Sequence, residues 1–306
     1  MIWYLLTLFI LIIIAPLLLS FIKMFKMILL FKKPISIFQG YRNFSKLIQK
    51  ETIISYEASE LTKYAPFLVL SPLLVIMLFL PPVVNVGFYV NFVDAFTITG
   101  LISLSTFFLM LLGLDSASSF GGMGSSREAF ISALVEPAMI LTIFSVSMIA
   151  NNLSIAQASI NLANHFPKEH MASFLFAGIS FFILLLAENG RVPVDNPETH
   201  LELTMVHEAM ILDITGIYLA IIESASAIKF IIFSSLFVSL FLPFGVGYSS
   251  FIVLIIFIGK LFLVAIFVAL IEVNMAKLRL FKVPNLLGIS IVFAFLSLIT
   301  FYVLGA

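Results

Sequence analysis

The 306-residue sequence contains no cysteine, and only 10% of its residues are charged. Without thiolates the chain cannot ligate an iron–sulfur cluster in the usual way, build a cysteine-ligated zinc site or form a disulfide. Soluble domains typically have about 25% charged residues, so the shortage of charge argues against a soluble enzyme. We therefore expect any electron transfer linked to this protein to occur in another polypeptide.

Histidine is also scarce, since the chain has only His165, His170, His200 and His207. None of them lies in the middle of an apolar run, where a ligand to a membrane-embedded haem would be placed. Sixteen Lys and Arg residues balance sixteen Asp and Glu residues, so no basic patch or acidic tail dominates. We therefore expect neither a b-type cytochrome nor a nucleic-acid partner.

Hydrophobic residues, in contrast, make up 62% of the chain. A membrane-spanning helix needs about 20 mostly apolar residues. Apolar runs of that length occur at about residues 3–22, 66–84, 96–114, 130–150, 172–187, 209–244, 251–271 and 285–304. They predict an all-α, polytopic integral membrane protein with about eight transmembrane helices in the lipid bilayer. Since no flexible linker or fixed-period repeat interrupts them, we expect residues 1–306 to form a single membrane domain.

Two of these runs need separate interpretation. The first lacks the positive start and the small-residue cleavage site of a signal peptide, so we expect a retained helix. The sixth, residues 209–244, has no proline before Pro243 and exceeds the length of one crossing. We expect a long, tilted helix there, or one that lies partly along the membrane interface.

The distribution of basic residues predicts the orientation in the cell membrane. Thirteen of the sixteen Lys and Arg residues fall on one side of the predicted spans. Because cytoplasmic loops are enriched in Lys and Arg, this side should be cytoplasmic. The predicted cytoplasmic loops are at about residues 23–63, 115–128, 189–207 and 273–284, and both termini should lie on the non-cytoplasmic side.

Acidic residues occur where the membrane makes them costly, in or beside the predicted spans. A carboxylate in mid-bilayer costs from about 3 to more than 10 kcal/mol unless it has a partner, a water-filled cavity or a proton. On one helix, Asp213 and Glu223 would be about 15 Å apart. We therefore interpret five acids as a proton-transfer route: Glu136, Glu188, Glu208, Asp213 and Glu223.

An alternative interpretation is structural. Lys229 and Lys260 lie inside apolar runs, and each could be the charge partner of Glu223, while other acids cap helix ends or support packing. A pairing role is our expectation for both lysines. Glu272 is a sixth acid at the edge of a span, and it could lie at the water interface beside the basic segment 277–282.

The segment 188–208 is the most polar part of the chain, with five acids, one arginine, two histidines and two prolines. The prolines preclude a regular helix through the segment and predict a bent cytoplasmic loop. Arg191 can bind a carboxylate bidentately, and Asp195 is the nearest candidate. A metal site is the weaker interpretation, because no histidine pair has the i, i+4 spacing of a zinc-binding helix.

At 188–195, the residues Glu-Asn-Gly-Arg-Val-Pro-Val-Asp resemble the loop that marks the complex I subunit 1 family. The continuation at 196–210 is closer to the membrane-bound nickel–iron hydrogenase branch, which includes formate hydrogenlyase and energy-converting hydrogenases. Segments 33–51, 113–128 and 235–245, with Glu136-Pro137, resemble the same family in the expected order. Together these motifs run across most of the chain.

The segment 113–128 also contains three closely spaced glycines, Gly121, Gly122 and Gly124. Glycines before a helix can cradle a phosphate, but the spacing fits neither a P-loop nor a dinucleotide-binding motif. We therefore favour a loop in which Ser126 caps the fourth spanning helix.

The resemblance implies a membrane subunit that is not catalytic by itself and that joins a soluble electron-transfer module to ion-translocating subunits. Its partners would be a nickel–iron large subunit, an iron–sulfur small subunit and antiporter-like membrane subunits, which would hold the nickel–iron centre and the clusters. Acids matching Glu136, Glu188, Glu208 and Glu223 line a polar route in that family, whereas Asp213 has no counterpart in its quinone enzymes. Candidate residues at or near the interface are Arg42, Arg127, Glu128, Arg191, Asp195, Glu198, His200, Glu202 and His207.

Two other functions remain open. A quinone-reducing complex I subunit would bind a lipid quinone between the loop after the first span and the loop 189–207. A stand-alone ion-coupled transporter would use the same acids for ion binding, and inverted repeats with broken helices in both halves are its usual signature.

Overall fold

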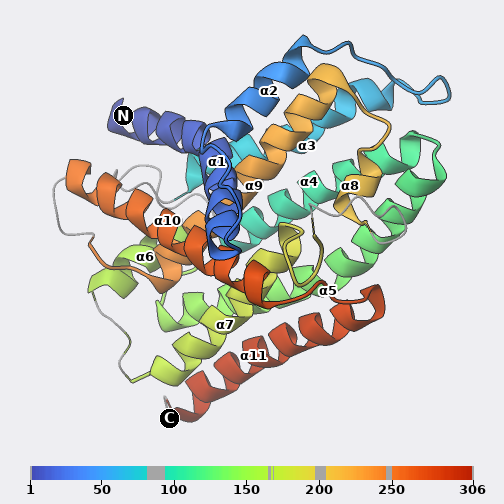
Figure 1. Ribbon diagram of the computed structural model, residues 1–306. Coiled ribbons are helices and arrows are strands. Elements are labelled where there is room, and N and C mark those ends of the chain that lie inside the picture. The colour runs from blue at the N-terminus through green and yellow to red at the C-terminus, as the bar shows by residue number, and fades with distance from the viewer. Residues whose placement is uncertain are drawn as a thin grey trace.

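A computed structural model describes residues 2–80, 94–164, 167, 169–196, 205–245 and 250–304. Within these residues the chain forms helices and no strand. In chain order the helices are α1 (Ile2–Leu29), α2 (Gln39–Gln49), α3 (Leu61–Phe79), α4 (Ala95–Asp115), α5 (Ser119–Ile149), α6 (Ile155–Asn164), α7 (Met171–Glu188), α8 (His207–Met210), α9 (Gly216–Phe241), α10 (Ser250–Asn274) and α11 (Val283–Leu304). The short 3-10 turn Leu280–Lys282 leads into α11, and Figure 1 shows the arrangement.

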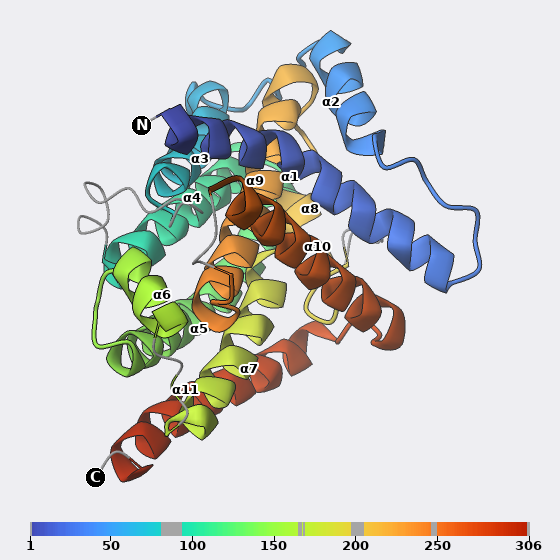
Figure 2. The same ribbon diagram turned by 90° about the vertical axis from the view of Figure 1, so that its left-hand side faces the viewer.

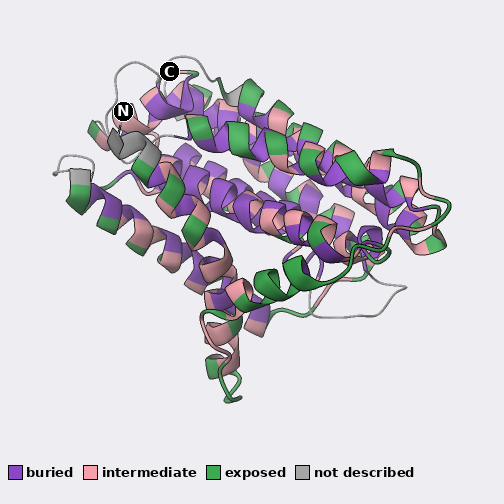
Figure 3. Cartoon of the chain, turned by 90° about the horizontal axis from the view of Figure 1, so that it is seen from above, coloured by how far each residue is buried: buried purple, intermediate pink, exposed green. Residues whose placement is uncertain are grey.

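Eight of the described helices are long and apolar enough to cross a membrane, which confirms the predicted number of spans. Their outer faces carry large apolar side chains, such as Phe9, Phe107 and Val292, which are 64%, 49% and 56% exposed. Figure 3 shows buried residues on the inner faces of the helices and exposed residues on the outside. Apolar side chains on the surface of a spanning helix are compatible with lipid, so the protein is a multi-pass membrane protein.

Helix α9 is the most enclosed of the eight described spans, because 72% of the residues in its 18-residue apolar stretch are buried. It packs against α1, α2, α3, α7 and α10 (Figure 2). Phenylalanine fills much of its interface with α7, where the ring centroids of Phe181 and Phe241 are 5.7 Å apart. Its charged residues differ in environment, because Lys229 is half-buried whereas Glu223 is exposed.

The segment between α4 and α5 differs from the predicted loop at 115–128, because α5 begins at Ser119. The side chain of Ser118 caps this helix by accepting a hydrogen bond of 3.0 Å from the backbone amide of Gly121. Ser126, the predicted cap, lies inside α5, where its hydroxyl donates to the carbonyl oxygen of Met123. Glycine favours a loop locally, but here it permits close helix packing, because a Cβ on Gly124 would lie 2.9 Å from the carbonyl oxygen of Val206.

The apolar run 209–244 is not one continuous helix. The single turn α8 ends at Met210, and α9 starts at Gly216, whose φ of 65° is in the left-handed region that favours glycine. Asp213 lies in the break between them and is exposed, so the prediction that it shares a helix with Glu223 is wrong. The apolar run is longer than one crossing because its first residues form α8 and the bend before Gly216.

Helices α5, α7 and α11 are joined by hydrogen bonds between buried hydroxyl groups. Thr142 of α5 pairs with Ser180 of α7 at 2.8 Å, and Ser297 of α11 donates to Ser145 of α5 at 3.2 Å. A third bond of 2.9 Å joins Ser173 of α7 to Thr300 of α11. Each pair of the three helices thus shares a bond between two hydroxyl groups, the kind of polar bond that holds helices together in lipid.

Candidate functional site

The candidate site begins where α7 ends, at Glu188. Gly190 has a φ of 55°, and the amide of Arg191 donates to the carbonyl oxygen of Leu186 at 2.9 Å, which turns the chain back against the helix end. The loop that follows is buried, with Arg191 and Asp195 only 6% and 4% exposed. Its charged side chains must therefore find partners inside the protein.

Glu188 is paired with Lys229 of α9. The Nζ atom of Lys229 lies 2.6 Å from Oε2 of Glu188, and the two side chains are 13% and 5% exposed. The same ammonium donates to the hydroxyl of Thr106 in α4 at 3.2 Å. One lysine in the middle of the bundle thus connects α4, α7 and α9.

Arg191 pairs with Glu272 of α10 rather than with Asp195, so the predicted local pair is wrong. Its guanidinium lies 3.2 Å from Oε1 of Glu272, and Nζ of Lys26 in α1 lies 3.5 Å from Oε2 of the same carboxylate. The guanidinium also stacks over the ring of Phe230 at 5.4 Å. Glu272 is buried between these two cations.

Asp195 has Lys277 as its ion-pair partner, at 2.6 Å. Its carboxylate also accepts hydrogen bonds from the backbone amides of Asn196 and Val206, at 2.8 and 3.2 Å. Asp195 therefore holds together the two ends of the segment 196–206. The predicted candidates Glu198, His200 and Glu202 fall between these ends and lie outside the described residues.

Helix α8 continues this site, because His207 and Glu208 form its first turn. The guanidinium of Arg127 in α5 donates to the carbonyl oxygen of Met205 at 2.8 Å and fixes the approach to α8. Burial lowers the pKa of His207 from 6.5 to about 4, the ammonium of Lys229 acts in the same direction, and Asp195 opposes them. His207 is therefore neutral at neutral pH and adds no cation to the site.

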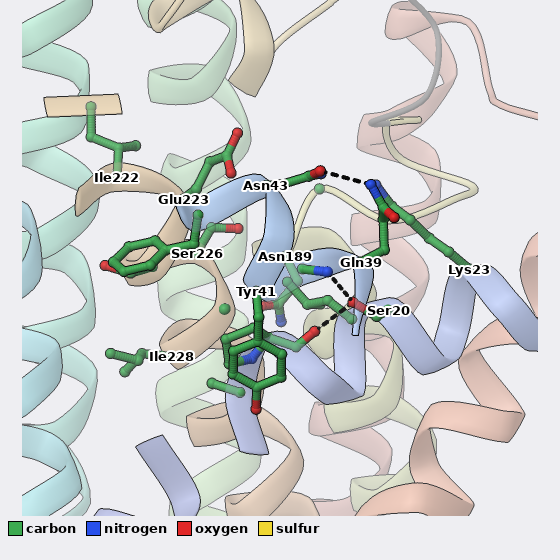
Figure 4. Close-up of a pocket in the computed structure, with 18 of the residues that line it drawn as sticks. Ser20, Lys23, Gln39, Tyr41, Asn43, Asn189, Ile222, Glu223, Ser226 and Ile228 are labelled. Atoms are coloured by element: carbon green, nitrogen blue, oxygen red, sulfur yellow. Dashed lines mark hydrogen bonds between the residues drawn. The ribbon is translucent and has the colours of Figure 1, made fainter. Parts of the chain in front are cut away.

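A cavity of about 830 Å³ lies between α1, α2, α9 and the loop after α7. Its wall on α2 is fixed by Gly40, whose amide donates to the hydroxyl of Ser20 at 2.9 Å, and by Tyr41, whose hydroxyl donates to the carbonyl oxygen of Ile13. Figure 4 shows Ser20, Tyr41 and Glu223 among the lining residues. Glu208 and Glu223 both line the cavity, together with apolar residues of α1. The cavity therefore brings two of the predicted proton-transfer acids to one polar space.

The remaining proton-transfer candidates lie apart from the cavity. Glu188 lies beside Lys229, and Glu136 lies in α5, where it is half-buried and precedes Pro137. Glu136 is eight residues after Glu128 on the same helix, which corresponds to about 12 Å along its axis. Glu188 is buried, Glu136 and Glu208 are half-buried, and Glu223 is exposed where it lines the cavity. Asp213 is also exposed, but it does not line the cavity.

Lys260 of α10 does not pair with an acid in the described structure. Its ammonium donates to the carbonyl oxygen of Leu242 at 2.6 Å and also to that of Phe244. These carbonyls follow the last turn of α9, where a cation is favourable because of the helix dipole. Glu223 therefore has neither Lys229 nor Lys260 as the partner that the structural interpretation suggested.

The other interface candidates are scattered. Arg42 lies exposed on α2 and donates to the hydroxyl of Ser36 at 3.3 Å, whereas Arg127 and Glu128 are half-buried on α5. Among the described residues, no group of three or more His, Asp or Glu side chains is arranged to hold a metal ion.

Sequence reasoning missed the roles of Thr106, Lys26 and Lys277. All three contact the site from helices or loops far away in the sequence, with separations from their partners of more than 80 residues. Lys26 could have been found as a candidate ion-pair partner, because it is a cation close to the first predicted span. Nothing in the local sequence marks Thr106.

Known proteins resemble the chain over most of its length. The family profile described as NADH dehydrogenase matches residues 29–304. Hydrogenase-4 component C of Escherichia coli (strain K12) is 33% identical over 211 residues, which cover 68% of this chain and 65%, slightly under two thirds, of that protein. Formate hydrogenlyase subunit 4 of the same strain is 26% identical over 293 residues, 94% of each chain.

A solved structure shows the same fold. A chain of the membrane-bound sulfane sulfur reductase, an archaeal respiratory membrane complex, superposes with a TM-score of 0.83. The superposition covers 97% of this chain and 98% of that chain, at 14% identity. The superposition shows a shared fold, and the profile match over residues 29–304 establishes that the chain belongs to the NADH dehydrogenase family, that of complex I subunit 1.

Proposed function

We propose that the chain is the membrane subunit of a respiratory complex of the hydrogenase-4 or formate hydrogenlyase type. The two relatives in Escherichia coli carry these names, and one of them aligns over nearly the whole chain. In this role the subunit anchors a soluble electron-transfer module and couples its chemistry to the movement of protons or sodium ions. The chemistry itself belongs to nickel–iron and iron–sulfur centres in partner subunits.

The orientation is part of this proposal. An even number of spans puts both ends of the chain on one side of the membrane, and the basic loops favour the non-cytoplasmic side for the ends. The large and small hydrogenase-type subunits would then dock on the loops that contain Arg42, Arg127 and the segment 189–207. Antiporter-like subunits would contact the spans from within the membrane.

One observation carries the ion-coupling role, namely the buried pair of Glu188 and Lys229 close to a cavity lined by Glu208 and Glu223. Buried ionisable groups in a membrane are costly, and they are retained mainly where charge or protons move. The route we infer runs from the cavity acids, past Glu188 and Lys229, to Glu136 on α5. Asp213 is the peripheral member of the set, because it is exposed outside the cavity.

The test is the variant pair Glu208→Gln and Glu136→Gln in the complete complex, reconstituted into vesicles. Glutamine keeps the size of the side chain but cannot release a proton, so ion movement per electron transferred should fall about tenfold or more while the complex still assembles. Glu60→Gln is the matched control, because Glu60 is exposed and pairs with Lys63. Full pumping in both variants would contradict the route. Repeating the assay without sodium separates the two ions.

The cavity supports one second function, the binding of a lipid quinone. Its volume of about 830 Å³ and its position between the loop after α1 and the loop after α7 fit the place expected for a quinone site. Inhibition of the purified complex by a quinone-site inhibitor would favour this function, and insensitivity would favour the hydrogenase-type role.

A further inference from the structure

The cavity between α1, α2 and α9 changes in polarity along α1. The residues of α1 that line it are apolar from Ile12 to Leu19 and polar at Ser20 and Lys23. The helix rises about 16 Å from Ile12 to Lys23, which is close to half of a hydrocarbon core of about 30 Å. The lining therefore matches one membrane leaflet, with an apolar region for lipid chains and a polar region for a headgroup.

The cavity also reaches the outer surface of the protein. Ile13 of α1 and Phe44 of α2 line it, and these side chains are 46% and 38% exposed. Helix α2 buries Leu47 and exposes basic residues such as Lys46. A helix with apolar residues on one face and basic residues on another is typical of the membrane interface. The opening beside α2 is therefore at a level where a lipid molecule can enter.

Two side chains of opposite charge line the cavity without joining each other. They are Lys23 of α1 and Glu223 of α9, both exposed, and Figure 4 shows them together with Gln39 and Asn43 of α2. The ammonium of Lys23 attracts the carboxylate of Glu223. Within the described part of the chain, however, no hydrogen bond or ion pair engages either side chain. A ligand with one negative and one positive group can therefore pair with both.

The other charges of the lining do not offer such a pair. Arg191 and Asp195 line the cavity, but they already form ion pairs with Glu272 and Lys277. Glu208 adds a second carboxylate to the lining, which further favours a ligand that carries a cation.

We propose that the cavity binds one zwitterionic phospholipid with a primary amine, the chemistry of phosphatidylethanolamine. An acyl chain lies along the apolar residues of α1, the phosphate pairs with Lys23, and the ammonium donates hydrogen bonds to Glu223. Lysine is a common partner of phosphate, and hydrogen bonds between charged groups are the strong ones. The inference goes beyond the proposed ion coupling, because such a lipid binds whether or not ions move.

The charges select this headgroup over the alternatives. A quinone head has no charge and would leave Lys23 and Glu223 without partners. A choline headgroup has a cation without an N–H group, so it cannot donate a hydrogen bond to Glu223. A glycerol headgroup has a phosphate for Lys23 but no cation for Glu223.

The test is photolabelling of the complete complex in phosphatidylcholine vesicles that contain a small fraction of phosphatidylethanolamine with a photoactivatable acyl chain. Illumination should label the segment 12–19 of α1, as identified by mass spectrometry of its peptides. Unlabelled phosphatidylethanolamine should compete with the probe. Phosphatidylcholine with the same chains should compete about tenfold less well or worse, because a hydrogen bond between charged groups is lost.

Substitutions locate the headgroup. Lys23→Gln and Glu223→Gln should each reduce labelling of the segment 12–19 about tenfold, because each removes one charged partner. Lys23→Arg should keep the labelling, since arginine also binds phosphate. Lys46→Gln is the matched control, because Lys46 is an exposed cation on α2 that does not line the cavity, and it should leave the labelling unchanged.

Equal competition by phosphatidylcholine would overturn the proposal, and so would unchanged labelling in both glutamine variants. Displacement of the probe by a short-chain quinone, without a preference among lipid headgroups, would assign the cavity to a quinone instead. The headgroup comparison uses the wild-type complex, so it decides the proposal even where a variant fails to assemble. Labelling needs no electron transfer. If it behaves as expected while pumping persists in Glu136→Gln and Glu208→Gln, the lipid site stands and the proposed route fails.

Discussion

Arg191 and Glu272 lie 3.2 Å apart although 81 residues separate them, and both are buried. Lys26 approaches the other oxygen of the same carboxylate at 3.5 Å. This contact ties the loop after α7 to α10 and α1. The loop therefore does not act as a free surface segment, because its arginine is fixed by two spanning helices.

Glu272→Gln should destabilise the protein strongly, because it leaves two buried cations without a counter-charge. Breaking one side of a buried ion pair typically costs about 3–5 kcal/mol. A lowered melting temperature of the detergent-solubilised protein would show the loss. The double variant Glu272→Gln with Arg191→Met should be more stable than Glu272→Gln alone, and a purely additive loss would contradict the pairing.

Asp195→Asn should loosen the segment 196–206, because it removes the ion pair with Lys277 and weakens the hydrogen bond from the amide of Val206. The expected cost is about 2–3 kcal/mol, since Lys277 is 20% exposed and keeps part of its hydration. Faster hydrogen exchange at Val206 and neighbouring amides would report the change. Lys282→Gln, in the same basic segment, is the control and should leave the exchange as in the wild type.

Gly124→Ala should destabilise the contact between α5 and α8. The added Cβ would lie 2.9 Å from the carbonyl oxygen of Val206 and 3.0 Å from Ala209, and overpacking of this kind costs about 1–3 kcal/mol. Gly122→Ala is the matched control, because its Cβ would meet no atom within 4 Å and alanine favours a helix by about 1 kcal/mol. Opposite shifts in melting temperature are therefore expected.

His207 should make stability depend on pH below neutrality. The unfolded chain protonates this residue near pH 6.5, whereas the folded chain resists protonation until about pH 4. The unfolded state thus binds more protons in this window, and stability should fall as the pH falls through it, by at most about 3 kcal/mol. Melting temperatures measured across the window should show a flatter slope for His207→Gln, and an unchanged slope would argue against a buried neutral imidazole.

The spans could be predicted from the sequence because the bilayer imposes a strong constraint. Every backbone amide in lipid needs an internal partner, so a long apolar run such as 251–271 has to be helical. Local composition failed at 115–128, where glycine and serine suggest a loop but α5 begins at Ser119. The glycines there serve packing between helices, and a single sequence does not reveal which surfaces meet.

The residue types of the site could be predicted from the sequence, but its ion pairs could not. Acids in spans stand out against an apolar background, which is why Glu188 and Glu208 could be found. The partners of Arg191 and Asp195 could not be found, because both lie on segments distant in sequence and the nearest opposite charge is not the one in contact. Asp213 was misplaced because hydropathy alone does not detect the break before Gly216.

The hydroxyl bonds that join α5, α7 and α11 have a consequence for how this molecule responds to its own charge state. Serine and threonine do not ionise in the physiological range, so neither a proton, salt nor a membrane potential can weaken the contacts between Thr142 and Ser180 or between Ser145 and Ser297. Ion pairs, by contrast, hold the loop after α7, where Arg191 contacts Glu272 and Asp195 contacts Lys277. The contacts between α5, α7 and α11 should therefore keep their strength over a pH range in which the ion pairs of the loop after α7 weaken.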